Sequence, residues 1–265
     1  MNKHILLYIL ILFLLYGCEK VIDVDLNEAS PTLVIEGNLS FVDRHLKVKI
    51  STTGSYFDND TPECVSGASV FLEDASDKRF EIDESAKGLY EKGNLNLKID
   101  HEYKLIVKRQ NITYTAVSTI PSVVKIDSLN YWYYSGERFY DDGYRIIMFF
   151  ADPADRENYY RIKVFRNGQL ENDINDLIVF DDSEIDGKKM LVRLRGQIFS
   201  KGDTAMIKFI SIDEGVWRYF TTFNEVVNIN PGSPAPANPV SNFDNGALGY
   251  FSAWSHDSQK IIVKK

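Results

Sequence analysis

The chain has 265 residues, of which 30 are lysine or arginine and 38 are aspartate or glutamate, so its formal net charge is −8 at pH 7. The basic residues form no cluster, and an acidic chain without a basic patch lacks the charge that attracts a nucleic-acid backbone. We therefore expect no nucleic-acid partner.

The chain begins with a short apolar run. Ile5–Tyr16 contains only apolar and aromatic residues, and Lys3 stands before it. A helix of about twelve residues extends about 18 Å, whereas the hydrocarbon core of a bilayer is about 30 Å thick. The run is too short for a stable transmembrane helix and has the length of the apolar region of a secretion signal. We expect residues 1–17 to be a signal peptide.

The signal segment ends in LYGC, with Gly17 directly before Cys18. This ending resembles the bacterial lipobox, Leu-x-Gly-Cys, in which the cysteine thiol is acylated and becomes the new N-terminus. The several acyl chains of such a lipoprotein bury enough methylene groups to make release from a membrane negligible. We therefore predict lipidation at Cys18, with a membrane as the partner that holds the chain. The alternatives are an ordinary secretory signal with a chance cysteine and an uncleaved membrane helix.

A polar tether is predicted over residues 18–31, CEKVIDVDLNEASP. At about 3.3 Å per residue it could hold a folded body up to about 40 Å from the membrane. Besides the predicted anchor only Cys64 remains, so we expect no internal disulfide. Cys64 lies in the polar stretch FDNDTPECVSG and is interpreted as an incidental free thiol in a loop.

Residues 32–121 show a period of two. In LKVKI, YKLIVK and ITYTAVSTI, apolar residues alternate with polar ones, and turn residues such as Gly54, Gly67 and Gly88 separate the runs. Short alternating runs between turns are typical of an antiparallel β-sandwich. We predict a sandwich of the immunoglobulin-like or transthyretin-like kind. Such modules usually support or bind and seldom catalyse, which is an analogy at the level of the fold.

A second β-rich domain is predicted over residues 122–265, after a boundary near Pro121. YRIIMFF, NYYRIKVF and TAMIKFISI are predicted strands. Asn167-Gly168 predicts a hairpin turn, because both residues tolerate positive φ. Asp186-Gly187 predicts a second turn, which leads into MLVRLR.

One amphipathic helix is predicted near residues 213–228, where apolar residues recur at spacings of four, three and four. The apolar stripe is interpreted as packing against the sheet, with a partner-binding helix as the alternative. A proline-rich loop at 231–240 follows, because its four prolines are incompatible with a helix or a central strand. LGYFSAW and KIIVKK are predicted as a final pair of strands.

Motifs for catalysis and metal binding are missing from the sequence. It has no HExxH, no Gly-x-Ser-x-Gly, no Walker loop and no Gly-x-Gly-x-x-Gly. The string DSEIDGKKMLVR, which begins at Asp182, mimics a calcium loop, but Arg193 stands at the twelfth position where such a loop needs a glutamate. We interpret this string as a solvated hairpin turn. We expect no catalytic residues, no metal and no cofactor, although a dispersed catalytic triad leaves no sequence signature.

Aromatic residues gather at YWYY, residues 131–134, where alternation in a strand places Trp132 and Tyr134 on one face. Either the tyrosines cover the sheet, or one face is a stacking platform for a sugar or a flat partner surface. A proline-stiffened loop loses little entropy on docking. We therefore add the segment after the helix and predict a contact surface of Trp132, Tyr134, Asn238, Asn242, Phe243 and Trp254.

Three segments carry a resemblance to a known family: CEKVIDVDLNEASPTLVIEGNLS, NYYRIKVFRNG and above all PANPVSNFDNGALGYFSAWS. They resemble the Bacteroidota lipoproteins catalogued as domain of unknown function 4249. The resemblance implies a lipoprotein of the outer membrane that is often encoded beside a TonB-dependent transporter, and hence an accessory role in nutrient uptake. No catalytic residues are defined for the family, so none are carried over.

The leading hypothesis is therefore a non-enzymatic accessory protein that binds a TonB-dependent transporter, as a lid or by delivering a nutrient. A free-standing surface module or adhesin that binds glycan or protein is the alternative, and a lipid-anchored hydrolase is a third. The sequence leaves open which face of the outer membrane the protein occupies.

Overall fold

A computed structural model describes most of the chain after the predicted tether. The described residues are 31–54, 62–76, 78–136, 142–173, 176–228 and 237–264. The predicted signal peptide, Cys18 and most of the predicted proline-rich loop lie outside them. Among the described residues, no helix is both long and apolar enough to cross a membrane.

In its described residues the chain is mainly β, with several antiparallel sheets and one α-helix, as the sequence predicts. The first strands are β1 (Leu33–Ser40), β2 (His45–Thr52), β3 (Ser69–Asp74), β4 (Arg79–Ile82), β5 (Glu84–Ala86), β6 (Leu89–Lys92), β7 (Glu102–Arg109) and β8 (Ile112–Thr119). The later elements are β9 (Ile126–Tyr134), β10 (Gly143–Ala151), β11 (Tyr159–Arg166), β12 (Gln169–Leu170), β13 (Ile178–Asp181), β14 (Lys189–Phe199), β15 (Thr204–Ile212), α2 (Glu214–Val227) and β16 (Leu248–Ile262).

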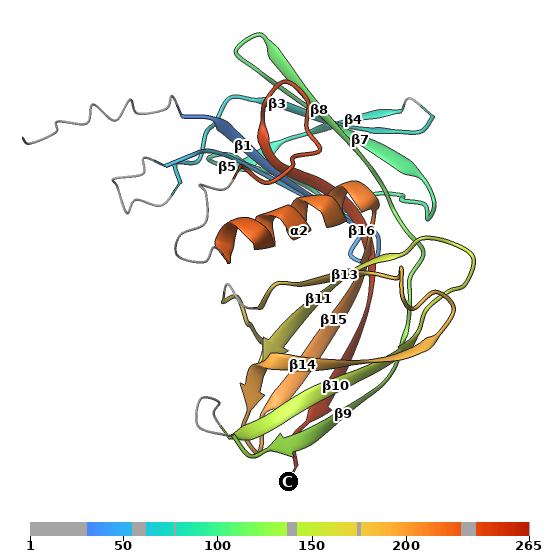
Figure 1. Ribbon diagram of the computed structural model, residues 1–265. Coiled ribbons are helices and arrows are strands. Elements are labelled where there is room, and N and C mark those ends of the chain that lie inside the picture. Colours follow the sequence, from blue (N-terminus) through green and yellow to red (C-terminus); the bar gives the residue numbers. More distant parts are fainter. Residues whose placement is uncertain are drawn as a thin grey trace, which may run out of the picture. The chain divides into compact units, whose positions relative to one another are not determined.

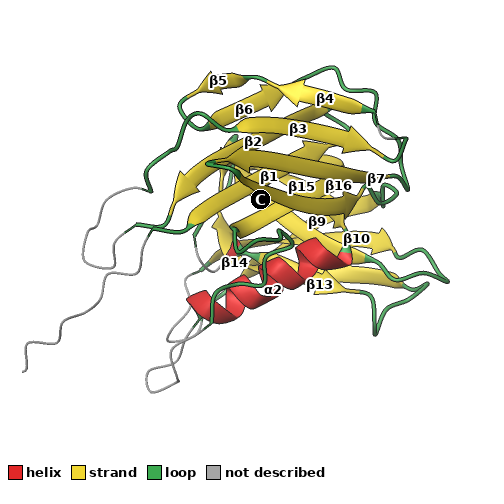
Figure 2. Ribbon diagram, turned by 90° about the horizontal axis from the view of Figure 1, so that it is seen from above, coloured by secondary structure: helices red, strands yellow, loops and turns green. Residues whose placement is uncertain are grey.

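The strands form one large sheet and two smaller ones. The large sheet has the order β12-β11-β15-β16-β1-β2-β6-β5, and β13 also pairs with β11. The smaller sheets are β14-β10-β9 and β4-β3-β7-β8. Neighbouring strands are antiparallel except β1 and β16, which are parallel. Figure 2 shows β3 and β7 in a layer beside β1 and β2, which is the sandwich arrangement expected of the first half of the chain.

Buried side chains form two cores and a smaller cluster under the helix. The first core lies between the β4-β3-β7-β8 sheet and the β1-β2-β6 part of the large sheet, and includes Ile35, Leu46, Leu72, Leu105 and Phe251. The second core lies between β14-β10-β9 and the β11-β15 part, and includes Met148, Phe150, Tyr160, Ile162 and Phe209. The helix cluster consists of Ile210, Ile212, Val216, Phe220 and Tyr250.

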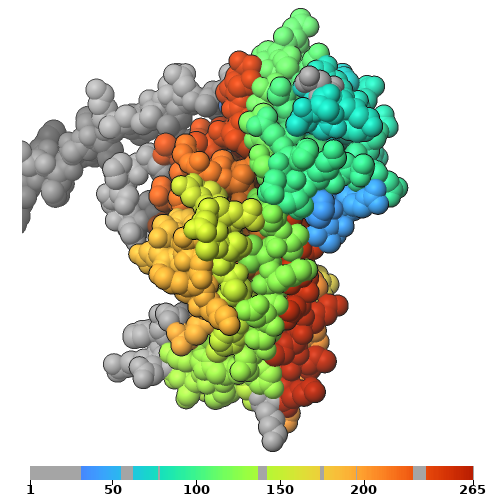
Figure 3. All heavy atoms as spheres, turned by 90° about the vertical axis from the view of Figure 1, so that its right-hand side faces the viewer, coloured from blue at the N-terminus to red at the C-terminus, as the bar shows by residue number. Residues whose placement is uncertain are grey.

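β16 joins these regions. The predicted final pair of strands is wrong, because Leu248–Ile262 is a single strand. The segment between the two predicted strands, SHDSQ, is polar but contains no glycine or proline that would turn the chain, so pairing with β15 continues through it. The predicted domains, residues 32–121 and 122–265, therefore share one strand and one continuous sheet. Figure 3 shows the red C-terminal residues lying alongside the green residues around β9.

The predicted hairpin turn is present between β11 and β12. Asn167 has φ 51° and Gly168 has φ 87°, and Phe165 pairs with Leu170 across the turn. Positive φ at both central residues is the requirement of a type I′ turn, which asparagine and glycine meet at low cost.

The helix α2 falls within the range where apolar periodicity predicts it. Asp213 is its N-cap and accepts a hydrogen bond from the Val216 backbone N–H at 2.9 Å. The second carboxylate oxygen of Asp213 accepts from the Thr119 N–H at 2.9 Å and from the Ser118 hydroxyl. Asp213 therefore fixes the start of α2 to the end of β8. Figure 1 shows α2 lying across the β11 and β16 part of the large sheet, next to β13.

We predict that Gly249→Ala destabilises the chain far more than Gly246→Ala. Both glycines have positive φ, 93° and 77°, but a Cβ at Gly249 would lie 2.1 Å from the Ile35 carbonyl oxygen, whereas none of the described atoms lies within 4 Å of a Cβ at Gly246. Backbone strain alone lowers the free energy of unfolding by about 1 kcal/mol. The added overlap between β1 and β16 raises the loss to about 3–5 kcal/mol. Chemical denaturation of the two full-length variants measures both; equal losses would contradict the close approach.

Candidate functional site

The predicted lipidation site, Cys18, lies outside the described residues, so its acylation stays a prediction. Cys64 is half-buried and forms no disulfide; its backbone makes an isolated bridge to Ser51.

Trp132 and Tyr134 lie half-buried on the face of β9 that points away from the second core. Trp132 is directly opposite Arg145 on β10, and the Arg145 guanidinium lies 5.6 Å from the centre of the Tyr134 ring. On the other face of the strand, Tyr131 packs edge-on against Tyr144 at 5.6 Å. The alternation of faces therefore follows the predicted pattern, with the core on the Tyr131 side.

The other residues of the predicted contact surface mainly hold the chain together. Asn238 is exposed. The Asn242 side chain binds both backbone groups of Phe251, donating to its carbonyl at 2.8 Å and accepting from its N–H at 2.9 Å. Phe243 is 7 % exposed and packs in the first core, so its ring is not available to a partner. Trp254 is half-buried beside the helix cluster. The structure therefore does not gather the six residues into one surface, because the loop before β16 and the face of β9 contact different strands.

The string interpreted as a solvated hairpin turn contains a buried acidic residue. Asp182 is 5 % exposed, as is Asp152 at the end of β10, and one oxygen of each lies within 4.8 Å of an oxygen of the exposed Asp186. Hydrogen bonds explain the burial. Asp182 accepts from the backbone and side-chain nitrogens of Asn158 at 2.8 and 3.0 Å, and Asp152 accepts from Gly187 N–H at 3.0 Å. The interpretation of this string as solvated is therefore wrong for Asp182, whose side chain is buried.

The three aspartates, Asp152, Asp182 and Asp186, have a mainly structural role. A calcium ion takes six to eight oxygen ligands, whereas three carboxylates supply one close oxygen each. The Tyr160 hydroxyl also donates to Asp152, and Asp186 accepts from the Asp155 N–H at 3.1 Å. These bonds hold the turn between β13 and β14 against the end of β10.

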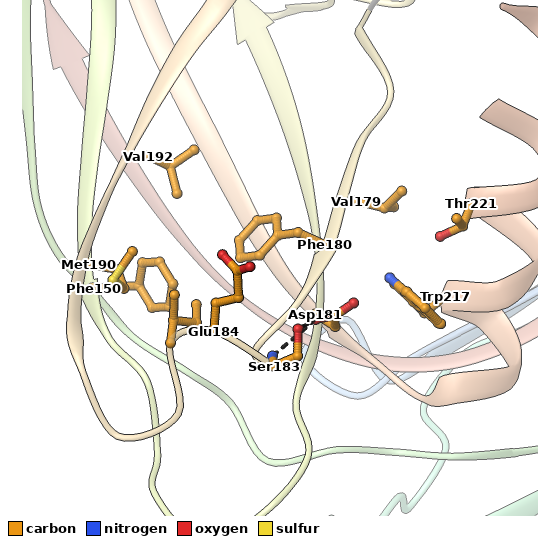
Figure 4. Close-up of a pocket in the computed structure, with 11 residues that line it drawn as sticks. Phe150, Val179, Phe180, Asp181, Ser183, Glu184, Met190, Val192, Trp217 and Thr221 are labelled. Carbon is orange, nitrogen blue, oxygen red and sulfur yellow. Dashed lines mark hydrogen bonds between the residues drawn. The ribbon is translucent and has the colours of Figure 1, made fainter. Parts of the chain in front are cut away.

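Two cavities lie next to α2. The first, of about 330 Å³, opens between β13, β14 and the helix. Figure 4 shows its walls: Phe150 and Phe180 of the second core on one side, and Trp217 and Thr221 of α2 on the other. The Glu184 carboxylate points into it, and no cationic side chain is among its lining residues.

The second cavity, here called the α2 cavity, has a volume of about 460 Å³. Its walls are aromatic and come from α2 and β16: Tyr219, Phe220, Phe223 and Tyr250. Its floor is β11, which supplies two cations, Arg161 and Lys163. Small-molecule sites typically combine apolar walls of this kind with a few convergent polar groups and volumes of about 300–1,000 Å³. The α2 cavity is therefore the candidate functional site.

Alternation along β11 aims the two cations at this cavity. Tyr160, Ile162 and Val164 are buried in the second core, so Arg161 and Lys163 lie on the opposite face of the sheet, toward α2. The sequence NYYRIKVF predicts the strand but does not show that α2 packs over one of its faces. The available signal was a pair of cations alternating with core residues, which reads as a solvated face unless the position of the helix is known.

Arg161 is held by aromatic groups. Its guanidinium lies 3.8 Å from the centre of the Phe220 ring and interacts with the hydroxyl of Tyr250. Burial lowers the pKa of Arg161, and burial also raises the pKa of Tyr250 and of Tyr219. In the described part of the chain no carboxylate forms an ion pair with Arg161.

Lys163 lies among like charges. It is directly opposite Lys208 on β15, and Arg161 is two residues along on the same face. Burial, together with the nearby charges of Arg161 and Lys208, lowers the pKa of Lys163 to about 8. Directly opposed like charges destabilise a strand pair. None of the described carboxylates forms an ion pair with either lysine.

Acidic side chains also line the α2 cavity, and most of them have polar partners of their own. Glu171 forms an ion pair with Arg166 at 2.7 Å, and Glu36 lies 3.6 Å from Lys49. Asp176 accepts from the Gln197 side-chain amide at 2.6 Å. The cations on the floor of the cavity, Arg161 and Lys163, are therefore left without an ion-pair partner among the described residues. This arrangement suits the binding of a ligand.

We predict that Lys163→Met raises the free energy of unfolding at pH 7. The folded-state pKa of Lys163, about 8, lies below the ordinary lysine value of 10.5, so its charge destabilises the folded state at pH 7. This penalty disappears as the pH rises from 8 toward 10.5. Removing the charge is worth about 1–3 kcal/mol. Urea denaturation at pH 7 and pH 10 measures the gain, which should shrink at the higher pH.

The matched control is Lys260→Met on β16, because Lys260 is exposed and does not line the cavity. Its effect should stay within about 0.5 kcal/mol. Both variants keep Arg161, Lys208 and the tyrosines of the wall, so these groups do not contribute to the difference between them. A Lys163→Met variant that is less stable than the wild type would show that the ammonium group has a structural partner.

Comparisons with known proteins place the chain in a family. No curated protein matches it. Among solved structures, the FN1-FN3 domains of chicken CNTN1 are similar at 11% identity, with 89% of this chain and 66% of that chain covered and a TM-score of 0.26. The chicken interferon gamma receptor alpha chain is similar at 12% identity, with 89% and 100% covered and a TM-score of 0.22. The family model described as domain of unknown function DUF4249 matches residues 19–260, and the chain therefore belongs to that family.

Proposed function

We propose that this protein is an outer-membrane lipoprotein that binds a TonB-dependent transporter and assists it in nutrient uptake, without catalysing a reaction. The observation that carries the proposal is the apolar run Ile5–Tyr16 followed directly by Gly17 and Cys18. A run of this length suits a secretion signal, and acylation at Cys18 would hold the rest of the chain at a membrane.

The attachment of the tether supports this arrangement. The first described strand, β1, begins at Leu33, two residues after the last residue of the predicted tether. β1 is an inner strand of the large sheet, paired with β2 on one side and β16 on the other. An anchor joined to an inner strand holds the body by an element that is hydrogen-bonded to a neighbour on both sides.

The α2 cavity supports a binding role. It is concave, has aromatic walls and carries two cations that none of the described carboxylates neutralises. The proposed transporter is supported by the family resemblance, which implies lipoproteins encoded beside such transporters.

A free-standing surface module is the second candidate. Trp132 and Tyr134 share the face of β9 that points away from the second core, and aromatic rings on a sheet can stack against sugars. Binding to a glycan array that Trp132→Ala abolishes, in the absence of any transporter, would favour this function.

We predict that the native chain carries acyl chains on Cys18 and co-purifies in mild detergent with a tagged transporter encoded beside its gene. Intact-mass spectrometry measures the acylation, and immunoblotting of the purified transporter measures the association. Cys18→Ala should abolish acylation and release the protein from the membrane fraction. Cys64→Ala is the matched control, since it removes the other thiol and should leave both properties intact.

Two results would refute this function. A native chain that is unacylated and retains Met1 would remove the anchor. An acylated chain that never accompanies the transporter would remove the partner and leave the surface module as the better explanation.

A further inference from the structure

We propose that the α2 cavity binds a small organic acid that carries a single carboxylate and an aromatic or apolar body. The carboxylate would lie against Arg161 and Lys163 on β11, and the body against the aromatic wall formed by α2 and β16. This inference rests on the proposed role as a binding protein, but not on the identity of the transporter.

The charge on the floor is the first argument. Arg161, Lys163 and Lys208 lie on adjacent strands of one sheet face, with Lys163 directly opposite Lys208. The described residues provide no carboxylate within ion-pair distance of any of the three. Like charges held together out of water repel each other more strongly than on an open surface. A bound anion relieves that repulsion, because it can lie within ion-pair distance of these cations, which none of the described carboxylates does.

The geometry of Arg161 is the second argument. Its guanidinium is fixed over the Phe220 ring at 3.8 Å, and the hydroxyl of Tyr250 is its other partner. A guanidinium has five N–H donors in a planar fork that matches a carboxylate. One hydroxyl engages only part of that fork. The remaining donors are therefore already oriented for a ligand, which lowers the entropic cost of binding.

The walls set the chemistry of the ligand body. The rings of Tyr219 and Tyr250 lie 4.9 Å apart, as do those of Phe220 and Tyr250, and Tyr219 stacks with Phe223 at 6.2 Å. These contacts make a continuous aromatic surface, and Phe223 is still 36 % exposed. A large apolar side chain left partly uncovered in a cavity that also contains cations favours a ligand that offers both an apolar surface and a negative charge.

The acidic residues of the cavity lining limit the charge of the ligand. Glu36, Glu171, Asp173 and Asp176 contribute to this lining. Their carboxylates repel a ligand with several negative charges, such as a nucleotide or a sugar phosphate, more strongly than a ligand with a single carboxylate. The volume of about 460 Å³ fits a small molecule. These features select a monoanionic organic acid over a polyanion.

Calorimetric titration of the purified full-length protein in a neutral detergent tests the proposal. The probes are phenylacetate, benzoate and 3-indolylacetate, and the control is phenylacetamide, the neutral analogue of phenylacetate. We expect at least one of the acids to bind with a Kd below about 1 mM, and phenylacetamide to bind at least about tenfold more weakly than phenylacetate. Inorganic phosphate is expected not to compete.

Two variants locate the site. Lys163→Met is expected to weaken binding of the acid at least about tenfold while leaving the protein folded. Phe223→Ala, which shortens the exposed part of the wall, is expected to weaken it several-fold. Lys260→Met should bind the acid as the wild type does, because Lys260 lies outside the cavity lining.

The proposal is overturned if none of the three acids binds, if phenylacetamide binds as tightly as phenylacetate, or if Lys163→Met leaves binding unchanged. Competition by phosphate at equal concentration would overturn the selection for a single carboxylate. Transporter co-purification separates the two hypotheses. If Lys163→Met no longer binds the acid but still co-purifies with the transporter, both hypotheses are supported. If the wild type co-purifies with the transporter but binds none of the acids, only the cavity proposal is refuted.

Discussion

The fold depends on the pairing of its last strand with its first. β16 lies between β1 and β15 in the large sheet, with its inner residues Phe251 and Ala253 in the first core and Ile261 against the second. The parallel pair is possible because Gly249, at φ 93°, lets the Ile35 carbonyl approach closely. Since these strands stand at opposite ends of the described chain, the sheet closes only after the whole chain is available. Such non-local pairing is slow to form.

The position of the helix follows from that sheet and determines the cavity. α2 fills the connection between β15 and β16, and Asp213 at its start is hydrogen-bonded to Thr119 at the end of β8. The first turn is thereby fixed to a strand of the first core, and Val216 and Phe220 are buried beneath it. The later turns cross β11, which belongs to the second core, and cover the α2 cavity. A cavity built from both regions therefore depends on a helix whose start is anchored in the first.

The sequence predicts the local features of this architecture better than its long-range ones. Alternation identifies β11, and Asn167-Gly168 identifies the turn after it, because both signals arise from neighbouring residues. The sequence does not show that β16 is unbroken, since its polar middle is supported by pairing with β15. Phe243 illustrates the same limit. Its motif suggests a contact with a partner, but Phe243 forms a bridge to Ala116 of β8 and is buried in the first core. The sequence does not reveal the α2 cavity, because the strand that forms its floor and the helix that forms its wall are far apart in the sequence.

The paired residues Lys163 and Lys208 bear on whether the cations next to α2 bind a ligand or only stabilise the fold. A purely structural account is sufficient for Arg161, since its contact with the Phe220 ring fastens α2 to the sheet. It does not extend to Lys163, which faces Lys208 without a described carboxylate and has a pKa lowered to about 8 by burial and by the charges beside it. Sequences tend to be locally consistent with their folds, and departures concentrate where function requires them. An apolar residue at position 163 would avoid this penalty, so the charge of Lys163 supports the proposed binding of an anion in the α2 cavity.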